Sequence, residues 1–125
     1  MNDTLDLLRK LEVVAEKRGM FRPEAYLFVL EALELAVASQ DEPGHVSGED
    51  VLDRIRTLGR ERYGALAGDV FNAWGVRGTV DFGRVVFHLV DEGLLHKRDE
   101  DTLADFIDKY DFREAFALRV HEGRA

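Results

Sequence analysis

Cysteine is absent from the 125 residues of this chain, and only two prolines occur. The absence of cysteine excludes disulfide bonds, thiolate zinc sites and a cysteine nucleophile, and it fits a reducing compartment. Long apolar runs are also missing, since stretches such as 25–30 and 85–90 fall far short of the ~20 residues that a membrane helix needs. The first residues lack the basic segment of a secretory signal. These absences predict a soluble protein without a membrane span.

The chain does contain enough apolar material for one core. Apolar residues make up 46% of the sequence, with eight Phe, three Tyr and one Trp. A chain of this length buries about two-thirds of its unfolded surface when it folds as one unit. We therefore predict a single domain over 1–125, made of an N-terminal helical pair (1–44), a helix–helix–helix–strand unit (45–98) and a C-terminal return segment (99–125).

Charge is unevenly distributed along the chain. The net charge is −8: five basic against nine acidic residues at 1–44 leave −4, four against eight at 99–125 leave −4, and 45–98 is balanced. Nucleic-acid binding depends on cations that neutralise phosphates. The acidic balance therefore argues against a large nonspecific DNA or RNA surface.

Helical periodicity dominates the first three-quarters of the chain. Thr4, Ser47 and Thr79 are predicted N-caps, and Pro23 suits the first turn of a helix. The glycines placed to end helices are Gly19, Gly64, Gly75 and Gly93. The predicted fold is a mainly α, compact domain of five to six helices. The segments predicted to be helical are 4–19, 23–39, 47–64, 65–74 and 79–92, with a loop at 40–44.

The C-terminal part is less regular. The apolar stretch within 94–98 predicts a short strand, 99–102 a turn, and 103–117 a return strand or a last helix. Three helices followed by a strand, a turn and a return segment is the order of a winged helix. The alternative is a plain helical bundle with a small C-terminal β-hairpin, and the sequence leaves both open.

A winged helix raises the question of DNA binding. Its recognition helix, 79–92, has only Arg84 and His88 against Asp81, Asp91 and Glu92, although contacts to bases and phosphates need cations and amides. The wing tip at 99–101 is wholly acidic and would repel phosphate. If the fold is a winged helix, these residues favour contact with protein.

Motifs that carry chemistry are scarce. The histidines, which are His45, His88, His96 and His121, lack the spacing of a zinc site. Paired carboxylates suit caps and turns, and no phosphate-binding glycine loop, serine elbow or dinucleotide fingerprint occurs. We predict no catalytic residue, no metal and no cofactor, and we expect His88 to be partly buried and hydrogen-bonded.

Arginine supplies the candidate interaction residues. Arg54, Arg56, Arg60 and Arg62 form the densest positive cluster, and Arg56 and Arg60 share one helix face. The first interpretation is a solvent-exposed helix face whose arginines pair with neighbouring carboxylates. The second is a binding site for an acidic protein or a few phosphates. Trp74 likewise suits either core packing or an exposed anchor. The residues predicted for partner binding are Arg22, Tyr26, Arg54, Arg56, Arg60, Trp74, Arg77 and Arg84.

Five segments of the chain resemble a family of small bacterial proteins. They are 21–29 (FRPEAYLFV), 45–48 (HVSG), 74–77 (WGVR), 81–83 (DFG) and 110–112 (YDF), so the resemblance spans nearly the whole chain. It implies a bacterial, cytoplasmic protein and brings no activity, substrate or cofactor with it. The DFG segment is not a kinase signature, because every other kinase element is missing.

The resulting prediction is a non-catalytic protein-interaction or regulatory adaptor module. It would bind a protein partner or a second copy of itself through an exposed apolar patch rimmed with arginine. The alternative is a nucleic-acid-associated winged-helix protein, which needs one continuous basic face formed by Arg54, Arg56, Arg77, Arg84, Lys97 and Arg98. A small enzyme without a recognisable motif is the third hypothesis, and it needs a polar pocket that gathers His45, His88 and buried carboxylates.

Overall fold

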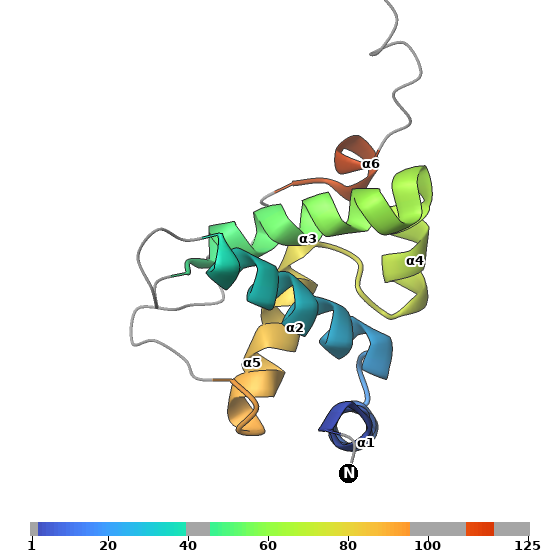
Figure 1. The fold of residues 1–125 in the computed structure, drawn as a ribbon. Coiled ribbons are helices and arrows are strands. Elements are labelled where there is room, and N and C mark those ends of the chain that lie inside the picture. Colours follow the sequence, from blue (N-terminus) through green and yellow to red (C-terminus); the bar gives the residue numbers. More distant parts are fainter. Residues whose placement is uncertain (1–2, 40–45, 96–109, 117–125) are drawn as a thin grey trace, which may run out of the picture.

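The computed structural model describes residues 3–39, 46–95 and 110–116, and this part of the chain is mainly helical, without a strand. The predicted mainly α fold class is therefore confirmed. The helical elements are α1 (Asp3–Arg18), α2 (Pro23–Ala38), α3 (Gly48–Tyr63), the 3-10 turn η1 (Gly64–Leu66), α4 (Ala67–Ala73), α5 (Thr79–Asp91) and α6 (Phe112–Ala115) (Figure 1). None of the helices in these ranges is long and apolar enough to cross a membrane.

Capping chemistry decides where the helices begin. The Ser47 hydroxyl accepts a hydrogen bond from the Asp50 amide at 3.1 Å, and the Asp50 carboxylate accepts one from the Ser47 amide at 3.0 Å, which confirms Ser47 as the N-cap of α3. Pro23 occupies the first turn of α2, as predicted.

Two predicted caps are wrong. Helix α1 already includes Asp3, so Thr4 lies inside it. Gly78 is the N-cap of α5, and Thr79 is a helical residue only 2% exposed. The physical reason at Thr79 is that its side chain packs inward, while the Asp81 carboxylate accepts a hydrogen bond from the Arg77 amide at 2.9 Å just before the helix. No side chain caps α5, and the Asp81 carboxylate in its first turn instead ties Arg77 to the helix and favours the positive end of the helix dipole.

The glycine after α5 turns the chain back on the helix. Gly93 has φ of 79°, and the amides of Leu94 and Leu95 both donate to the carbonyl of Leu89, at 2.8 and 3.2 Å. The strand predicted from Leu94 is therefore wrong for these two residues, because their amides close the helix end instead of pairing with a neighbouring strand. The rest of that strand, the turn at 99–102 and the loop at 40–44 lie outside the described residues.

The described part of the predicted return segment, 110–116, contains one helical turn and no strand. Phe112–Ala115 forms the single turn α6, and the Tyr110 hydroxyl donates to the carbonyl of Leu52 at 2.8 Å, which ties this segment to α3. The described residues thus give no support to a C-terminal hairpin, and the remainder of 103–117 is outside them.

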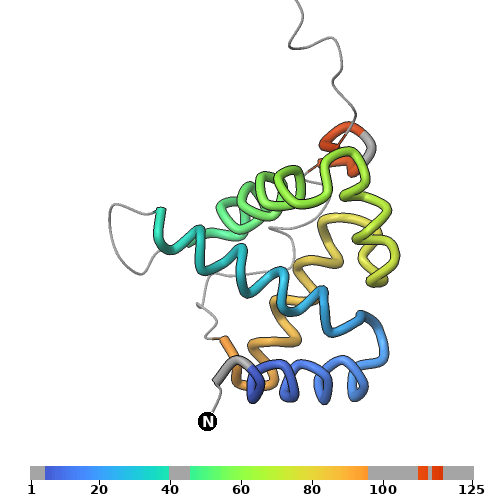
Figure 2. Tube along the Cα trace, turned by 45° about the vertical axis from the view of Figure 1, so that its right-hand side comes forward, coloured from blue at the N-terminus to red at the C-terminus, as the bar shows by residue number. Residues whose placement is uncertain are grey.

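Helix α2 is central and packs against α1, α3 and α5. Figure 2 shows α1 and α2 as two arms that meet at their connection and diverge away from it, with α5 between them. Phe71 of α4 is the hub of the core: it is fully buried, and six rings have centroids 5.0 to 6.5 Å from its own. These rings belong to Phe28, Tyr63, Trp74, Phe82, Phe112 and Phe116. The aromatic cluster therefore joins α2, α3, α4, α5 and α6.

Candidate binding surface

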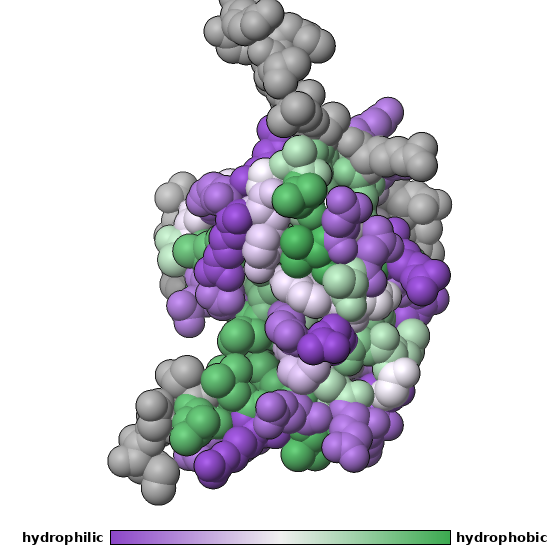
Figure 3. All heavy atoms as spheres, turned by 90° about the vertical axis from the view of Figure 1, so that its right-hand side faces the viewer, coloured by the Kyte–Doolittle hydropathy of each residue, from purple (hydrophilic) through white to green (hydrophobic). Residues whose placement is uncertain are grey.

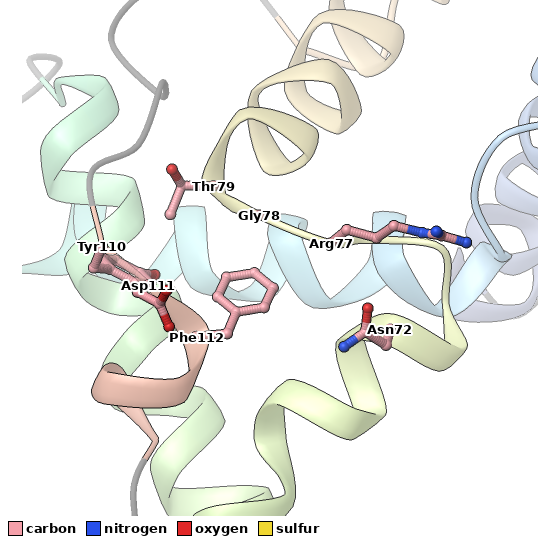
Figure 4. Close-up of a pocket in the computed structure, with 7 residues that line it drawn as sticks. All are labelled: Asn72, Arg77, Gly78, Thr79, Tyr110, Asp111 and Phe112. Atoms are coloured by element: carbon pink, nitrogen blue, oxygen red, sulfur yellow. The ribbon is translucent and has the colours of Figure 1, made fainter.

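A polar pocket opens where α4, the start of α5 and the segment before α6 meet. Its volume is about 580 Å³, and it is lined by Asn72, Arg77, Gly78, Thr79, Tyr110, Asp111 and Phe112 (Figure 4). The Phe112 ring forms an apolar wall and contacts Phe71 at a centroid distance of 5.5 Å. The Asn72 amide donates to the carbonyl of Gly68 at 3.0 Å, so its own oxygen stays available to accept.

The backbone beside the pocket is held by short-range hydrogen bonds. The Gly75 amide donates to the carbonyl of Asn72 at 3.0 Å, and the Val76 amide donates to that of Phe71 at 2.9 Å. Gly75 has φ of 96°, and a Cβ at this position would lie 2.6 Å from the Met20 carbonyl oxygen. Only glycine permits this conformation and this close approach. The α4–α5 connection is therefore fixed against the α1–α2 connection.

The two connections together present three exposed side chains, Met20, Arg22 and Arg77, which we call the connection surface. The Arg22 amide donates to the carbonyl of Trp74 at 3.0 Å, which joins the two connections directly. Met20 is 49% exposed, and the side chains of Arg22 and Arg77 are exposed too. Figure 4 shows the Arg77 side chain extending from the pocket toward the chain between α1 and α2. An apolar side chain and two cations thus share one part of the surface.

The two cations differ in their ionic partners. Arg22 lies 3.3 Å from the Glu24 carboxylate, in a pair whose two side chains are at least half exposed. Such an exposed pair contributes little and is readily exchanged for another partner. The Arg77 guanidinium makes no ion pair or hydrogen bond with the described residues, because the nearby Asp81 carboxylate accepts from Arg84 at 2.7 Å and from the Arg77 amide.

The predicted arginine cluster on α3 is occupied by contacts within the chain. Arg54 donates to the Ser39 hydroxyl, the Arg56 guanidinium lies 5.8 Å from the Tyr110 ring centroid, and Arg60 Nε donates to the Ala115 carbonyl at 2.9 Å. Arg62 makes a two-pronged pair with Glu31, at 2.7 and 3.0 Å. These residues hold α3 to α2 and to the segment around α6, which is closer to the first interpretation of the cluster.

Tyr26 and Trp74, both predicted to contact a partner, lie in the core. Tyr26 is fully buried and its hydroxyl is 2.7 Å from His88 Nδ1, so His88 is hydrogen-bonded and partly buried as expected. Burial raises the pKa of Tyr26 to about 12 and, together with the nearby Arg18 charge, lowers the pKa of His88. Trp74 is 9% exposed and packs in the aromatic cluster.

The structure brings together only some of the residues predicted for partner binding. Arg22, Trp74 and Arg77 belong to the two connections, and Arg84 lies in α5, paired with Asp81. Arg54 and Arg60 contact other parts of the chain, and Arg56 contacts Tyr110, which lines the polar pocket together with Arg77. Of the arginines that the nucleic-acid hypothesis requires, Arg54, Arg56 and Arg84 each contact another group of the chain, and Lys97 and Arg98 lie outside the described residues. Within those residues, no three His, Asp or Glu side chains are placed to hold a metal ion.

Sequence reasoning missed a second surface feature, a groove between α1 and α5. It is lined by Arg9, Lys10, Val13, Val14, Glu92 and Leu94, and its volume is about 300 Å³. Val13 is 64% exposed. The sequence did contain a signal for it: Val13 lies outside the buried apolar stripe of its helix and follows Arg9 and Lys10 by one helical turn.

The fold and these surfaces define a mainly helical protein with a polar pocket and an exposed, partly cationic surface. No protein family, curated protein or solved structure matches the chain. The resemblance of its five segments to a bacterial family therefore stays a prediction, and function has to be argued from the surfaces themselves.

Proposed function

We propose that this chain is a non-catalytic protein-interaction module that binds an acidic segment of a partner protein on the connection surface. The observation that carries the proposal is the joining of two chain connections that place exposed Met20 beside Arg22 and Arg77. Arginine beside an exposed apolar side chain is typical of binding hot spots. A cation without an ionic partner, such as Arg77, favours an occupant that carries carboxylates.

The fixed backbone of this surface also supports a binding role. Gly75 and the hydrogen bond from Arg22 to Trp74 hold both connections before any partner arrives. A surface that is already ordered loses less conformational entropy on association. The adjacent pocket supplies Asn72 and Phe112, so hydrogen-bonding and apolar groups of a partner both find complements there.

The nucleic-acid alternative, with its winged helix and C-terminal hairpin, is weaker. Three of its required arginines are engaged: Arg54 with Ser39, Arg56 with Tyr110 and Arg84 with Asp81. The net charge of −8 opposes phosphate binding as well.

Affinity purification of the tagged chain from its host at low salt, with and without nuclease, tests the proposal. A nuclease-resistant partner should be recovered with the wild type and lost with Arg22→Glu/Arg77→Glu. Arg9→Glu/Lys10→Glu makes the same charge change away from this surface and should keep the partner that Arg22→Glu/Arg77→Glu loses. If Arg22→Glu/Arg77→Glu loses no partner selectively, or if recovery depends on nucleic acid, the proposal is contradicted.

A further inference from the structure

The groove between α1 and the C-terminal end of α5 shares no residue with the connection surface or the polar pocket. Val13, Val14 and Leu94 form its apolar part, and Arg9 and Lys10 lie one helical turn before Val13. Large exposed apolar residues are few in the described part of the chain, and Val13 is among the most exposed of them. Figure 3 shows, for one face of the molecule, how apolar side chains reach the surface between hydrophilic ones.

Ion pairs fix the shape of this groove. The Glu92 carboxylate lies 2.8 Å from Arg18 Nη2 and 3.1 Å from Lys17 Nζ, and Arg18 also approaches the Asp91 carboxylate at 3.6 Å. The side chains of Arg18 and Glu92 are 27% and 16% exposed, so their contact is partly shielded from solvent, whereas the Lys17 side chain is 62% exposed. The contacts clamp α1 to the end of α5, and they neutralise the one carboxylate that lines the groove.

The rim of the groove is left cationic. Arg9 and Lys10 make no ion pair or hydrogen bond with the described residues, and both side chains are exposed. Asp6, one helical turn before Arg9 and Lys10, and Glu16, one turn after Val13, do not line the groove. Since Glu92 is paired with Lys17 and Arg18, the cations that line the hollow without an ionic partner among the described residues are Arg9 and Lys10.

We infer that this groove binds a short acidic amphipathic helix of a partner protein. An apolar side chain of that helix sits against Val13, Val14 and Leu94, and carboxylates one turn away pair with Arg9 and Lys10. Residues three or four apart on a helix lie about 5–6 Å from each other. The distance from Val13 to Arg9 and Lys10 along α1 therefore matches the distance between an apolar residue and a carboxylate one turn away on the partner helix. The inference is independent of the connection surface, and together the two surfaces would let one chain bridge two partners.

Other occupants fit the groove less well. Nucleic acid gains affinity from many phosphate contacts, and two free cations supply few of them. A volume of about 300 Å³ lies at the lower end of ligand pockets and suits a side-chain anchor more than a whole small molecule. An acidic helix uses both the apolar floor and the cationic rim. Because the contact is small and partly electrostatic, it should be transient and weakened by salt.

Selection from a random 16-residue peptide library displayed on phage, with the whole chain as bait at low salt, tests this inference. The enriched peptides should carry Asp or Glu three or four residues from Leu, Ile, Phe or Met. Fluorescence anisotropy with the most enriched peptide then gives its Kd. Arg9→Glu/Lys10→Glu and the milder Arg9→Gln/Lys10→Gln should each raise this Kd at least about tenfold, and Val13→Ser should raise it as well. Arg22→Glu/Arg77→Glu is the matched control and should leave it unchanged.

Several outcomes would overturn the inference. These are the failure to enrich any peptide, enrichment of peptides without carboxylates, and a Kd that the groove variants leave unchanged. Loss of binding to phosphatidylglycerol vesicles or duplex DNA in Arg9→Glu/Lys10→Glu, without any peptide binding by the wild type, would also overturn it. Equal melting temperatures of wild type and variants ensure that a raised Kd reports the groove and not unfolding. A partner lost only with Arg22→Glu/Arg77→Glu bears on the connection surface alone.

Discussion

Gly59 is the residue of α3 whose missing side chain leaves room for two rings of the aromatic cluster. A Cβ there would lie 3.0 Å from Phe71 Cζ and 3.3 Å from Phe116 Cε1, and both rings are buried. Alanine would gain about 1 kcal/mol in helix propensity over glycine. Because Phe71 is surrounded by six rings and cannot recede, we expect overpacking to outweigh this gain.

We predict that Gly59→Ala lowers the free energy of unfolding by about 1 kcal/mol, and that Gly59→Leu lowers it further. Chemical denaturation followed by Trp74 fluorescence measures both. Glu61→Ala, at an exposed position of the same helix, is the control and should change stability by less than about 0.5 kcal/mol. A Gly59→Ala protein as stable as the wild type would show that the two rings can yield.

The sequence alone identifies which charged residues cluster along the chain, but not which groups they contact in the fold. The positive cluster at 54–62 is evident from the sequence alone, yet whether an arginine is free depends on residues far away in the chain: Arg62 meets Glu31, and Arg60 meets Ala115. Among the described residues the Arg77 guanidinium has no ionic partner, since Arg84 and the Arg77 amide already bond the two oxygens of the nearby Asp81. Burial of Tyr26 follows from three packed helices, and helical periodicity alone does not specify that arrangement.

At the scale of elements, the start of α3 depends on a reciprocal pair of hydrogen bonds between Ser47 and Asp50. We predict that Ser47→Ala destabilises the protein by about 1 kcal/mol, because an amide of the first turn loses its acceptor. Denaturation in urea measures the loss. Thr57→Ala is the control, since that hydroxyl only bonds the Asp53 carbonyl within the same helix; an equal loss in both variants would argue against the cap.

Element ends show why some local signals succeed and others fail. Ser47 succeeded as a prediction because its partner, Asp50, lies three residues away and the whole capping box is local. Thr79 failed because its burial depends on the packing of α5, and because the helix begins one residue earlier, at the N-cap Gly78, without a side-chain cap. Local chemistry therefore fixed the start of α3, whereas tertiary packing decided the start of α5.

Gly75 joins the α4–α5 connection to the α1–α2 connection. With φ of 96° and a Met20 oxygen 2.6 Å from the position of a Cβ, Gly75→Ala should cost about 2 kcal/mol or more. Gly78→Ala is the comparison: a Cβ there meets no heavy atom within 4 Å, so its cost should be confined to the weaker N-cap preference of alanine, about 1 kcal/mol or less. Thermal unfolding of the two variants measures the difference. If the connection surface binds a partner, Gly75→Ala should also weaken that binding even at temperatures where the protein stays folded.

At the scale of the whole molecule, titratable groups gather where α1, α2 and α5 meet. His88 and Tyr26 share a hydrogen bond there, and Glu92 pairs with Lys17 and Arg18. Burial lowers the pKa of His88 below its usual 6.5, and hydrogen bonds from Lys17 and Arg18 lower that of Glu92 below 4.5. Burial raises the pKa of Tyr26 from 10.0 to about 12.

These shifts predict how stability depends on pH. The unfolded chain binds a proton at His88 before the folded chain does, so stability should fall as pH drops below 6.5, and fall again below 4.5, where unfolded Glu92 becomes protonated. At high pH the unfolded chain ionises Tyr26 first, so stability should also fall above pH 10. The stability maximum should thus lie between pH 6.5 and 10.

Urea denaturation across this pH range measures the profile, and two variants assign its acid limb. His88→Gln keeps an acceptor for the Tyr26 hydroxyl but cannot titrate, so it should flatten the decline just below pH 6.5 and leave the decline below 4.5 intact. Glu92→Gln should do the reverse, because it keeps the shape of the side chain and removes its charge. If both variants kept the wild-type profile, the acid sensitivity would arise from carboxylates spread over the surface, and the junction of α1, α2 and α5 would not be its source.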